Sequence, residues 1–140
     1  MKKINVVAID GPSASGKGAL SRSIAHRFGF DILDSGLLYR LYAFLSHLKI
    51  GIDDISEVIA KDISFVVEDD SVHVIYEGNK ITNKLRSEGI AKIASEHSAK
   101  KEVRELLFDI QRDFYNGNGL VADGRDMGTV VFKDAKIKIF

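Results

Sequence analysis

The chain has 140 residues, and its 20 basic and 20 acidic side chains give it no net charge when the histidines are neutral. A surface that binds a nucleic-acid backbone needs clustered Lys and Arg, so this balance argues against a nucleic-acid partner. The absence of cysteine excludes a disulfide framework, a cysteine-ligated zinc site and a thiol nucleophile. No apolar run is long enough to predict a membrane span, and the length fits one domain, residues 1–140.

The N-terminal third alternates strand and helix signals. Ile4–Asp10 is a continuous apolar run that ends in an acid, which is typical of a parallel strand covered on both faces. After a glycine-rich turn, a helix is expected over residues 17–28 and should end at Gly29. One face of it is marked by apolar residues that recur every four positions: Leu20, Ile24 and Phe28. A strand over 30–34 and a helix capped by Asp34-Ser35 follow, with Leu38, Tyr42 and Leu45 on one face.

Residues 63–82 predict a small antiparallel insert in an otherwise α/β chain. Ile63–Glu68 and Val72–Glu77 are strand-like runs around Asp69-Asp70-Ser71, which is a hairpin signal. A second turn is expected at Gly78-Asn79 and a short third strand over Lys80–Thr82.

Helical spacing returns near Ser87, where Ile90, Ile93 and Ala94 share a face. A second helical stripe follows, made of Val103, Leu106, Leu107, Ile110 and Phe114. Strands are predicted at Leu120–Asp123 and at Ile137–Phe140. Because parallel sheets are built from strand–helix–strand units, a final strand without a helix after it indicates that the C-terminal part of the fold is missing.

Residues 11–17 read GPSASGK and match the phosphate-binding pattern G-x-x-x-x-G-K, the P-loop. In such a loop the backbone N–H groups converge on phosphate oxygens, the following helix directs its positive end at them, and the lysine reaches the outer phosphates. The motif follows an expected strand and opens an expected helix, as this mechanism requires. The predicted phosphate site comprises Gly11, Pro12, Ser13, Ala14, Ser15, Gly16, Lys17 and Gly18.

The residue after the lysine departs from the common pattern, in which a Ser or Thr helps to hold Mg²⁺. Gly18 and then Ala19 stand there instead. Phosphates, water and a distant acid would then hold the ion. Asp123, at the end of an expected strand, is the candidate acid, acting directly or through water; the alternative is a turn residue that ends the strand.

Three segments, in this order, point to a family: IDGPSASGKG, LDSGLLYR and ADGRDMGTVVF. Together they resemble the bacterial cytidylate kinases, P-loop nucleoside monophosphate kinases that phosphorylate CMP and dCMP with ATP and Mg²⁺. The resemblance runs from about Ile4 to Phe140. It implies an α/β nucleoside monophosphate kinase fold with a parallel core sheet, helices on both faces and a small antiparallel β insert. We expect a cytoplasmic monomer whose partners are ATP, CMP and dCMP.

The resemblance also implies roles for single residues. Residues 11–18, with Lys17, would bind the ATP phosphates, and the insert at about 63–82 would belong to the acceptor-binding region. Arg125 and Asp126 match the pair that holds the acceptor phosphate and sugar, and with Lys17 they are the predicted catalytic residues. The other predicted acceptor-binding residues are Ser35, Tyr39 and Arg40, together with Ser95 and Arg104 at the cytosine base.

The residue types support part of this assignment. Ser35 stands at an expected helix start, which favours an anion, and the guanidinium groups of Arg40 and Arg125 suit a phosphate. Arg40 could instead form a surface salt bridge, and Arg104 could be an exposed helix charge paired with neighbouring acids. Ser95 rests on the resemblance alone.

Cytidylate kinases continue beyond this point with a lid that carries several arginines. Since phosphoryl transfer depends on positive charge around the moving group, two functions stay open. One is phosphorylation of CMP and dCMP, and the other is a nucleotide-binding fragment that transfers phosphate poorly. A P-loop kinase of shikimate or adenylate type is a third reading, whereas the lack of an N-K-x-D motif argues against a GTPase.

Overall fold

The computed structural model describes residues 2–12, 16–69 and 71–140. The chain forms two compact units, the first made of Met1–Gly36 and Phe108–Phe140 and the second of Leu37–Leu107. Helices α2 (Ser35–His47) and α6 (Lys101–Arg112) each begin in one unit and end in the other. The interpretation of residues 1–140 as one kinase domain stays a prediction.

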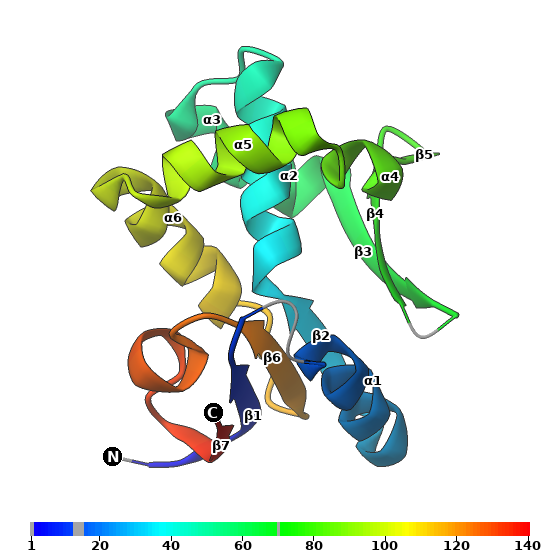
Figure 1. Cartoon of the computed structure of the whole chain (residues 1–140), viewed down its shortest axis with the longest axis vertical. Helices are drawn as coiled ribbons and strands as arrows, with labels where there is room; N and C mark the ends of the chain where they lie inside the picture. The colour runs from blue at the N-terminus through cyan, green and yellow to red at the C-terminus, as the bar shows by residue number, and fades with distance from the viewer. Residues whose placement is uncertain (1, 13–15, 70) are drawn as a thin grey trace. The chain divides into compact units, whose positions relative to one another are not determined.

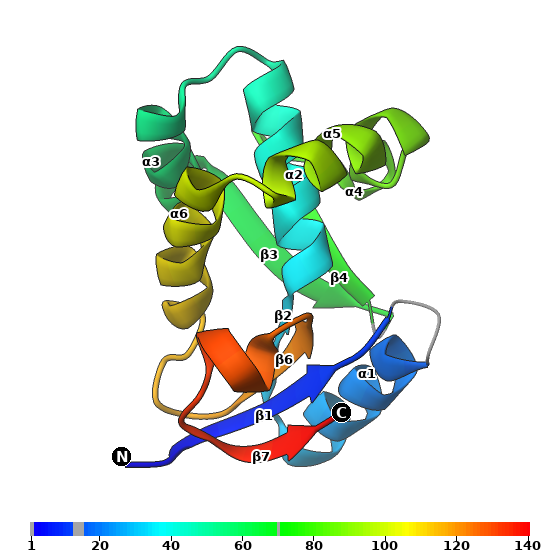
Figure 2. The ribbon, with the colours of Figure 1, turned by 60° about the vertical axis from the view of Figure 1, so that its left-hand side comes forward.

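A four-stranded parallel sheet forms the core of the first unit, in the order β2-β6-β1-β7 (Figure 1). Its strands are β1 (Ile4–Asp10), β2 (Asp31–Asp34), β6 (Leu120–Gly124) and β7 (Ala135–Ile139). Figure 2 shows β1 running between β6 and β7. All of β6 and the middle of β1 are buried, as expected of strands covered on both faces. The predicted parallel core is confirmed, although β7 begins at Ala135, before the predicted Ile137.

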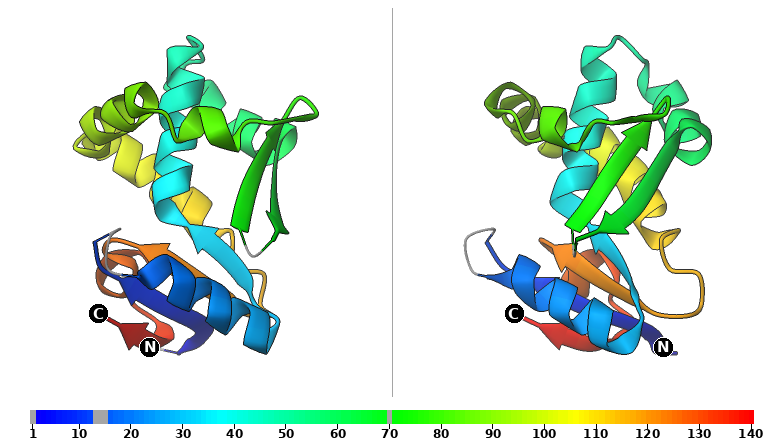
Figure 3. Two further views of the ribbon diagram at one scale, coloured as in Figure 1. Left: turned by 45° about the vertical axis from the view of Figure 1, so that its right-hand side comes forward. Right: turned by 90° about the vertical axis from the view of Figure 1, so that its right-hand side faces the viewer.

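Helix α1 (Lys17–Phe28) packs against this sheet from one side, and the five-residue π-helix η1 (Met127–Val131) lies behind it in both views of Figure 3. Gly29, with φ of 66°, ends α1 as predicted. The predicted stripe of Leu20, Ile24 and Phe28 does not mark the buried face, because Leu20 and Phe28 are 41% and 62% exposed. Ser21 and Ala25 face inward instead. These small side chains let the helix lie close to the sheet.

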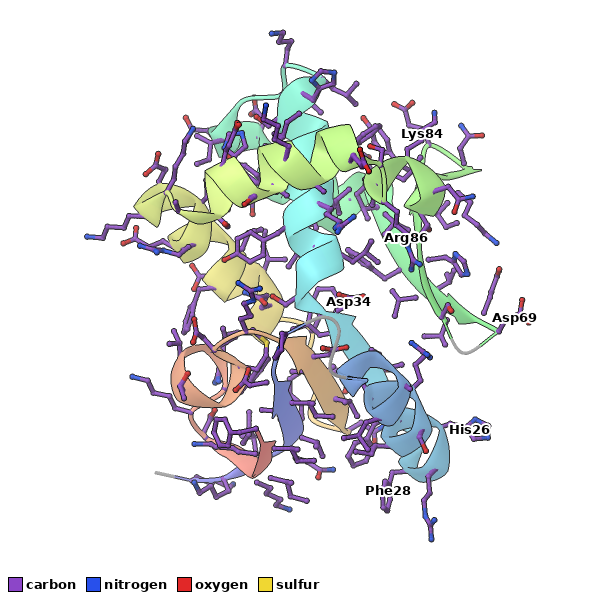
Figure 4. All side chains as sticks on the ribbon, viewed as in Figure 1. His26, Phe28, Asp34, Asp69, Lys84 and Arg86 are labelled. Atoms are coloured by element: carbon purple, nitrogen blue, oxygen red, sulfur yellow. The ribbon has the colours of Figure 1, made fainter. Side chains whose placement is uncertain are left out.

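The second unit contains a three-stranded antiparallel sheet of β3 (Ile63–Glu68), β4 (Ser71–Tyr76) and β5 (Asn79–Lys80), which confirms the predicted insert. Figure 4 labels Asp69 near the tip of the β3–β4 hairpin. The predicted second turn is wrong by one residue: Glu77 and Gly78 both have positive φ, and Tyr76 pairs with Asn79. Positive φ at both central positions is what a type I′ two-residue hairpin turn requires.

The predicted third strand over Lys80–Thr82 is also displaced. Thr82 begins α4 (Thr82–Leu85), and its buried Oγ1 accepts a hydrogen bond of 2.9 Å from the Val74 N–H. The side chain thus satisfies a strand donor of β4 at the point where β5 has ended.

The remaining helices of this unit are α3 (Ile52–Asp62) and α5 (Glu88–Ser98), together with most of α2 and α6. Ser87 caps α5, and Ile90 and Ala94 pack beside Ala43 of α2, which confirms the predicted α5 face. The stripe on α6 is confirmed at its buried positions, but the helix ends at Arg112, before Phe114. Neither α3 nor η1 is among the predicted elements. Across the described part of the chain, no helix combines the length and apolar character that crossing a membrane requires.

The Arg112 side chain joins the end of α6 to the segment that follows η1. Its two guanidinium nitrogens donate to the two Asp134 carboxylate oxygens at 2.8 and 3.2 Å. One of them also donates to the Val131 carbonyl at 3.1 Å, and the group lies 5.2 Å from the centre of the Phe132 ring. The bidentate hydrogen bond holds the pKa of the Asp134 carboxyl below its usual value.

The variant Arg112→Met should lower the free energy of unfolding at neutral pH by about 1.5–3 kcal/mol, because it leaves the Asp134 carboxylate without this donor. The difference should persist above the pKa of an unfolded Asp, about 3.9. It should shrink as the pH falls through the lower folded-state pKa, since protonation of Asp134 weakens the pair, and the part that remains at lower pH comes from the other contacts of Arg112, with the Val131 carbonyl and the Phe132 ring. Urea unfolding across this pH range measures it.

Lys101→Gln provides the control for this experiment. It removes a pair with Glu105 whose side chains are 81% and 67% exposed, so it should change stability by less than about 0.5 kcal/mol. An Arg112→Met chain as stable as the wild type at neutral pH would contradict the assignment of a stabilising role to the Arg112–Asp134 pair.

Candidate nucleotide site

Three acids lie along one edge of the parallel sheet, at the carboxyl ends of its strands. Asp10 ends β1 and Asp34 ends β2. In the strand register, Asp34 lies opposite Asp123 of β6, and Asp10 lies opposite Gly124. Figure 4 marks Asp34 where β2 meets α2. Open α/β sheets bind ligands outside the carboxyl ends of their strands, so this edge is the candidate site of the first unit.

The predicted P-loop connects this edge to α1. Gly11 follows β1 directly and donates its N–H to the Gly124 carbonyl at 3.4 Å. Gly16, with φ of 81°, precedes α1, whose first turn contains no acidic residue. The positive end of α1 is thereby available to an anion. The predictions for Ser13, Ala14, Ser15 and the Lys17 side chain lie outside the described residues.

Asp123 and Gly18 are close neighbours in this unit. A Cβ atom built on Gly18 would lie 4.0 Å from Oδ2 of Asp123 and 3.3 Å from a guanidinium nitrogen of Arg22. Position 18, where other P-loops carry a hydroxyl for Mg²⁺, therefore faces the carboxylate that we predict as the distant acid. Carboxylate oxygen is a ligand that Mg²⁺ prefers, so Asp123 fits the ion as a single protein ligand. Among the described residues, no cluster of three or more His, Asp or Glu could hold a metal by itself.

Ser35 is held by a residue that the sequence did not single out. Its hydroxyl donates a hydrogen bond of 2.6 Å to Oε1 of Gln111, and both side chains are almost fully buried. A Cβ atom on Gly124 would lie 2.6 Å from the Ser35 Cβ, so only glycine allows β6 to approach α2 this closely. Gln111 has no local signal, since its partner lies 76 residues away in the chain.

Arg125 and Asp126 follow β6 and are exposed. Asp126 has φ of 58°, in the left-handed region that residues other than glycine seldom adopt. Its main-chain carbonyl accepts hydrogen bonds of 3.0 Å from Val130 and from Val131, and the bond to Val131 forms the wide turn of η1. Residues in such sparsely populated conformations cluster at functional sites.

Asp10 holds the segment that follows this pair. Its carboxylate accepts hydrogen bonds from the Met127 N–H at 2.6 Å and from the Gly128 N–H at 2.9 Å. Asp10 is not among the predicted site residues. Its position directly before the P-loop was the one available signal.

The other predicted acceptor residues belong to the second unit. Tyr39 and Arg40 are half-buried on α2, and a guanidinium nitrogen of Arg40 donates to the Leu85 carbonyl of α4 at 3.3 Å. Ser95 on α5 and Arg104 on α6 are exposed. Within each unit the structure thus groups part of the predicted set, and the role of each residue stays a prediction.

Comparison of the chain with known proteins identifies its family. The family model described as cytidylate kinase matches residues 7–140. The chain belongs to the cytidylate kinase family. This agrees with the resemblance carried by the P-loop and the DSGLLYR and DGRDMGT segments.

Curated relatives of the family are similar along nearly the whole chain. The cytidylate kinase of Marinomonas sp. is 50% identical over 141 residues, and that of Vibrio cholerae is 48% identical over 141 residues. The cytidylate kinase of Pectobacterium atrosepticum is 44% identical over 140 residues. Each match covers 96% of this chain but 62% of the relative. The chain therefore spans less than two thirds of the length of these relatives.

The buried bond between Ser35 and Gln111 makes a double-mutant cycle informative. Ser35→Ala or Gln111→Leu alone should each lower the free energy of unfolding by about 1–3 kcal/mol, because each leaves the other buried polar group without this partner. The double variant should lose clearly less than the sum, since no orphaned group is left. Urea unfolding of the four proteins gives the coupling. Strict additivity would show that the bond does not form in solution.

Proposed function

We propose that the protein transfers the γ-phosphoryl group of ATP to the 5′-phosphate of CMP or dCMP. The observation that carries this proposal is the pairing of β1 with β6 in register. The P-loop leaves the end of β1 and the Arg125-Asp126 segment leaves the end of β6, so one edge of the sheet carries both phosphate-binding segments. Membership of the cytidylate kinase family supports CMP as the acceptor.

On the donor side, the P-loop backbone and the start of α1 provide N–H groups for the phosphates, and Lys17 provides a positive charge. Asp123 would help to hold Mg²⁺, which when bound neutralises charge on the transferring phosphates. Asp123 is 8% exposed, so its carboxylate is largely withdrawn from water while it faces position 18. That placement makes up in part for the hydroxyl that Gly18 lacks.

On the acceptor side, Arg125 binds the CMP phosphate and Asp126 accepts hydrogen bonds from the sugar hydroxyls. Arg40 adds a second guanidinium for the phosphate, with Ser35 and Tyr39 in the same acceptor segment. The hydrogen bond from Arg40 to the Leu85 carbonyl uses one guanidinium nitrogen and leaves the other N–H donors of Arg40 for a ligand. Ser95 and Arg104 contact the cytosine base.

Catalysis in this scheme is positioning and charge stabilisation. Phosphoryl transfer between nucleotides needs the acceptor oxygen in line with the leaving oxygen, and cationic groups around the moving phosphoryl. Lys17 and Arg125 supply such groups from the two segments at the sheet edge. No side chain acts as a nucleophile, and no covalent intermediate forms.

A coupled ADP-release assay with ATP and Mg²⁺ tests the reaction on the 140-residue chain. Turnover with CMP should exceed turnover with AMP by about 100-fold or more, because polar groups that bind cytosine are left unpaired by adenine. Calorimetry with CMP accompanies the assay. CMP binding without turnover would support the alternative function, a nucleotide-binding chain with little transferase activity. A folded chain that neither binds nor phosphorylates CMP would refute the assignment of CMP as acceptor.

A pair of arginine variants separates phosphate binding from base recognition. Arg125→Met should weaken CMP and AMP binding alike, by about 10–100-fold, because it removes a charged donor to the phosphate that both share. Arg104→Met should weaken CMP binding and leave AMP binding unchanged, since it removes a contact with cytosine. Arg27→Met, at the exposed end of α1, is the matched control. Equal effects of Arg104→Met on CMP and AMP would contradict base recognition by Arg104.

A further inference from the structure

We propose that Asp10 is a positioning residue that holds the acceptor-binding pair Arg125 and Asp126 in place. This inference rests on the proposed function of that pair. Asp10 itself would touch neither nucleotide. Its carboxylate acts through the main chain that follows the pair, while the end of β1 holds the chain before it.

The carboxylate of Asp10 fixes the chain after the pair. Its two oxygens each accept one N–H, from Met127 at 2.6 Å and from Gly128 at 2.9 Å. Two successive peptide units are thus bound to one side chain, and hydrogen bonds to a carboxylate are about twice as strong as neutral ones. The first turn of η1 cannot rotate without breaking both.

The backbone at the end of β1 fixes the chain before the pair. Asp10 lies opposite Gly124 in the parallel register, and the next residue, Gly11, donates its N–H to the Gly124 carbonyl. Arg125 and Asp126 are therefore a two-residue span whose flanking residues, Gly124 and Met127, are both tied to the end of β1. A span this short has few conformations when both of its ends are held.

Gly128 supplies an independent sign that this approach is built into the fold. A Cβ atom there would lie 3.1 Å from Cγ and Cδ of Lys138 and 3.4 Å from Oδ2 of Asp10. Both neighbours are on strands of the core sheet, β1 and β7. A Cβ atom at position 128 would require the Lys138 side chain to move by a few tenths of an ångström, so the segment passes close to both strands.

The two held ends of this span maintain the backbone conformation of Asp126. With φ of 58°, Asp126 is in a left-handed backbone that is unfavourable for a residue with a side chain. This backbone sets the directions in which the Arg125 and Asp126 side chains leave the segment. Loss of the Asp10 bonds should let the span relax, and the acceptor would then meet a disordered pair.

The variant Asp10→Asn tests this role on the 140-residue chain, with calorimetry of CMP and of ATP as the readouts. Asn keeps one acceptor but sets an NH₂ group against the second N–H. CMP affinity should fall by about 10–100-fold, the equivalent of a lost charged hydrogen bond, while ATP affinity falls much less. Asp10→Asn should weaken CMP binding less in the Arg125→Met background than in the wild type, because the part of its effect that acts through the Arg125 contact is already lost.

Two further variants keep the result interpretable. Ile32→Val removes a methylene from the apolar cluster under α1 and should cost about 1 kcal/mol of stability without changing CMP affinity. Gly128→Ala keeps the Asp10 carboxylate but crowds it and the Lys138 side chain, so it should also weaken CMP binding selectively. The Gly128→Ala variant replaces Asp10→Asn in the test if the Asp10→Asn chain does not fold.

The possible failures are distinct. A wild-type chain that does not bind CMP refutes the proposed function, and the role of Asp10 with it. Wild-type binding that Asp10→Asn and Gly128→Ala leave unchanged refutes the role of Asp10 alone. The same holds if CMP and ATP affinities fall equally, or if the Arg125→Met effect adds in full to that of Asp10→Asn.

Discussion

The parallel pairing of β1 with β6 is the constraint on which the candidate site depends. Five successive residues of each strand pair in register, from Val6 with Leu120 to Asp10 with Gly124. Both strands end at the same level, so the P-loop and the Arg125-Asp126 segment start side by side although more than a hundred residues separate them. A slip of one residue would exchange the side chains on the two buried faces of a strand and disrupt their close packing. The register is therefore as firmly specified as the core itself.

Much of this fold could be predicted from the sequence because its strands are buried on both faces. The runs that form β1 and β6 are mostly apolar, with Asn5 near the start of β1 and an acid near the end of each strand, so they predict buried strands. The buried face of a helix that is covered on one side only is harder to predict. On α1 the sequence favours the face of Leu20 and Phe28, which the structure exposes. The small side chains of Ser21 and Ala25 are the buried ones. Helix α3 was missed although Ile52, Ile55 and Ile59 have helical spacing. The insert was predicted, but its second turn uses Glu77, a residue without a turn preference, in a left-handed backbone.

The candidate site divides along a similar line. The P-loop is a local pattern, so the sequence predicts it directly. The role of the Arg125-Asp126 pair is predicted only through the family resemblance. Asp10 and Gln111 were not predicted, because what defines them is a partner 117 or 76 residues away. A carboxylate at the end of a strand and a glutamine within a helix are common features, and neither shows in sequence which backbone or hydroxyl it will bind. Supporting residues of this kind are found only from the folded chain.

The left-handed backbone of Asp126 explains why such support is needed. Holding a residue with a side chain in this region costs on the order of 1–2 kcal/mol. Each of the two charge-assisted hydrogen bonds that Asp10 accepts can offset a conformational cost of about this size. The segment can then keep its shape before any nucleotide arrives, and the binding free energy of the acceptor is not consumed in ordering it. If the proposed reaction takes place, it relies on placing two phosphates in line, so the balance between the strain at Asp126 and the hydrogen bonds that Asp10 accepts would contribute to catalysis.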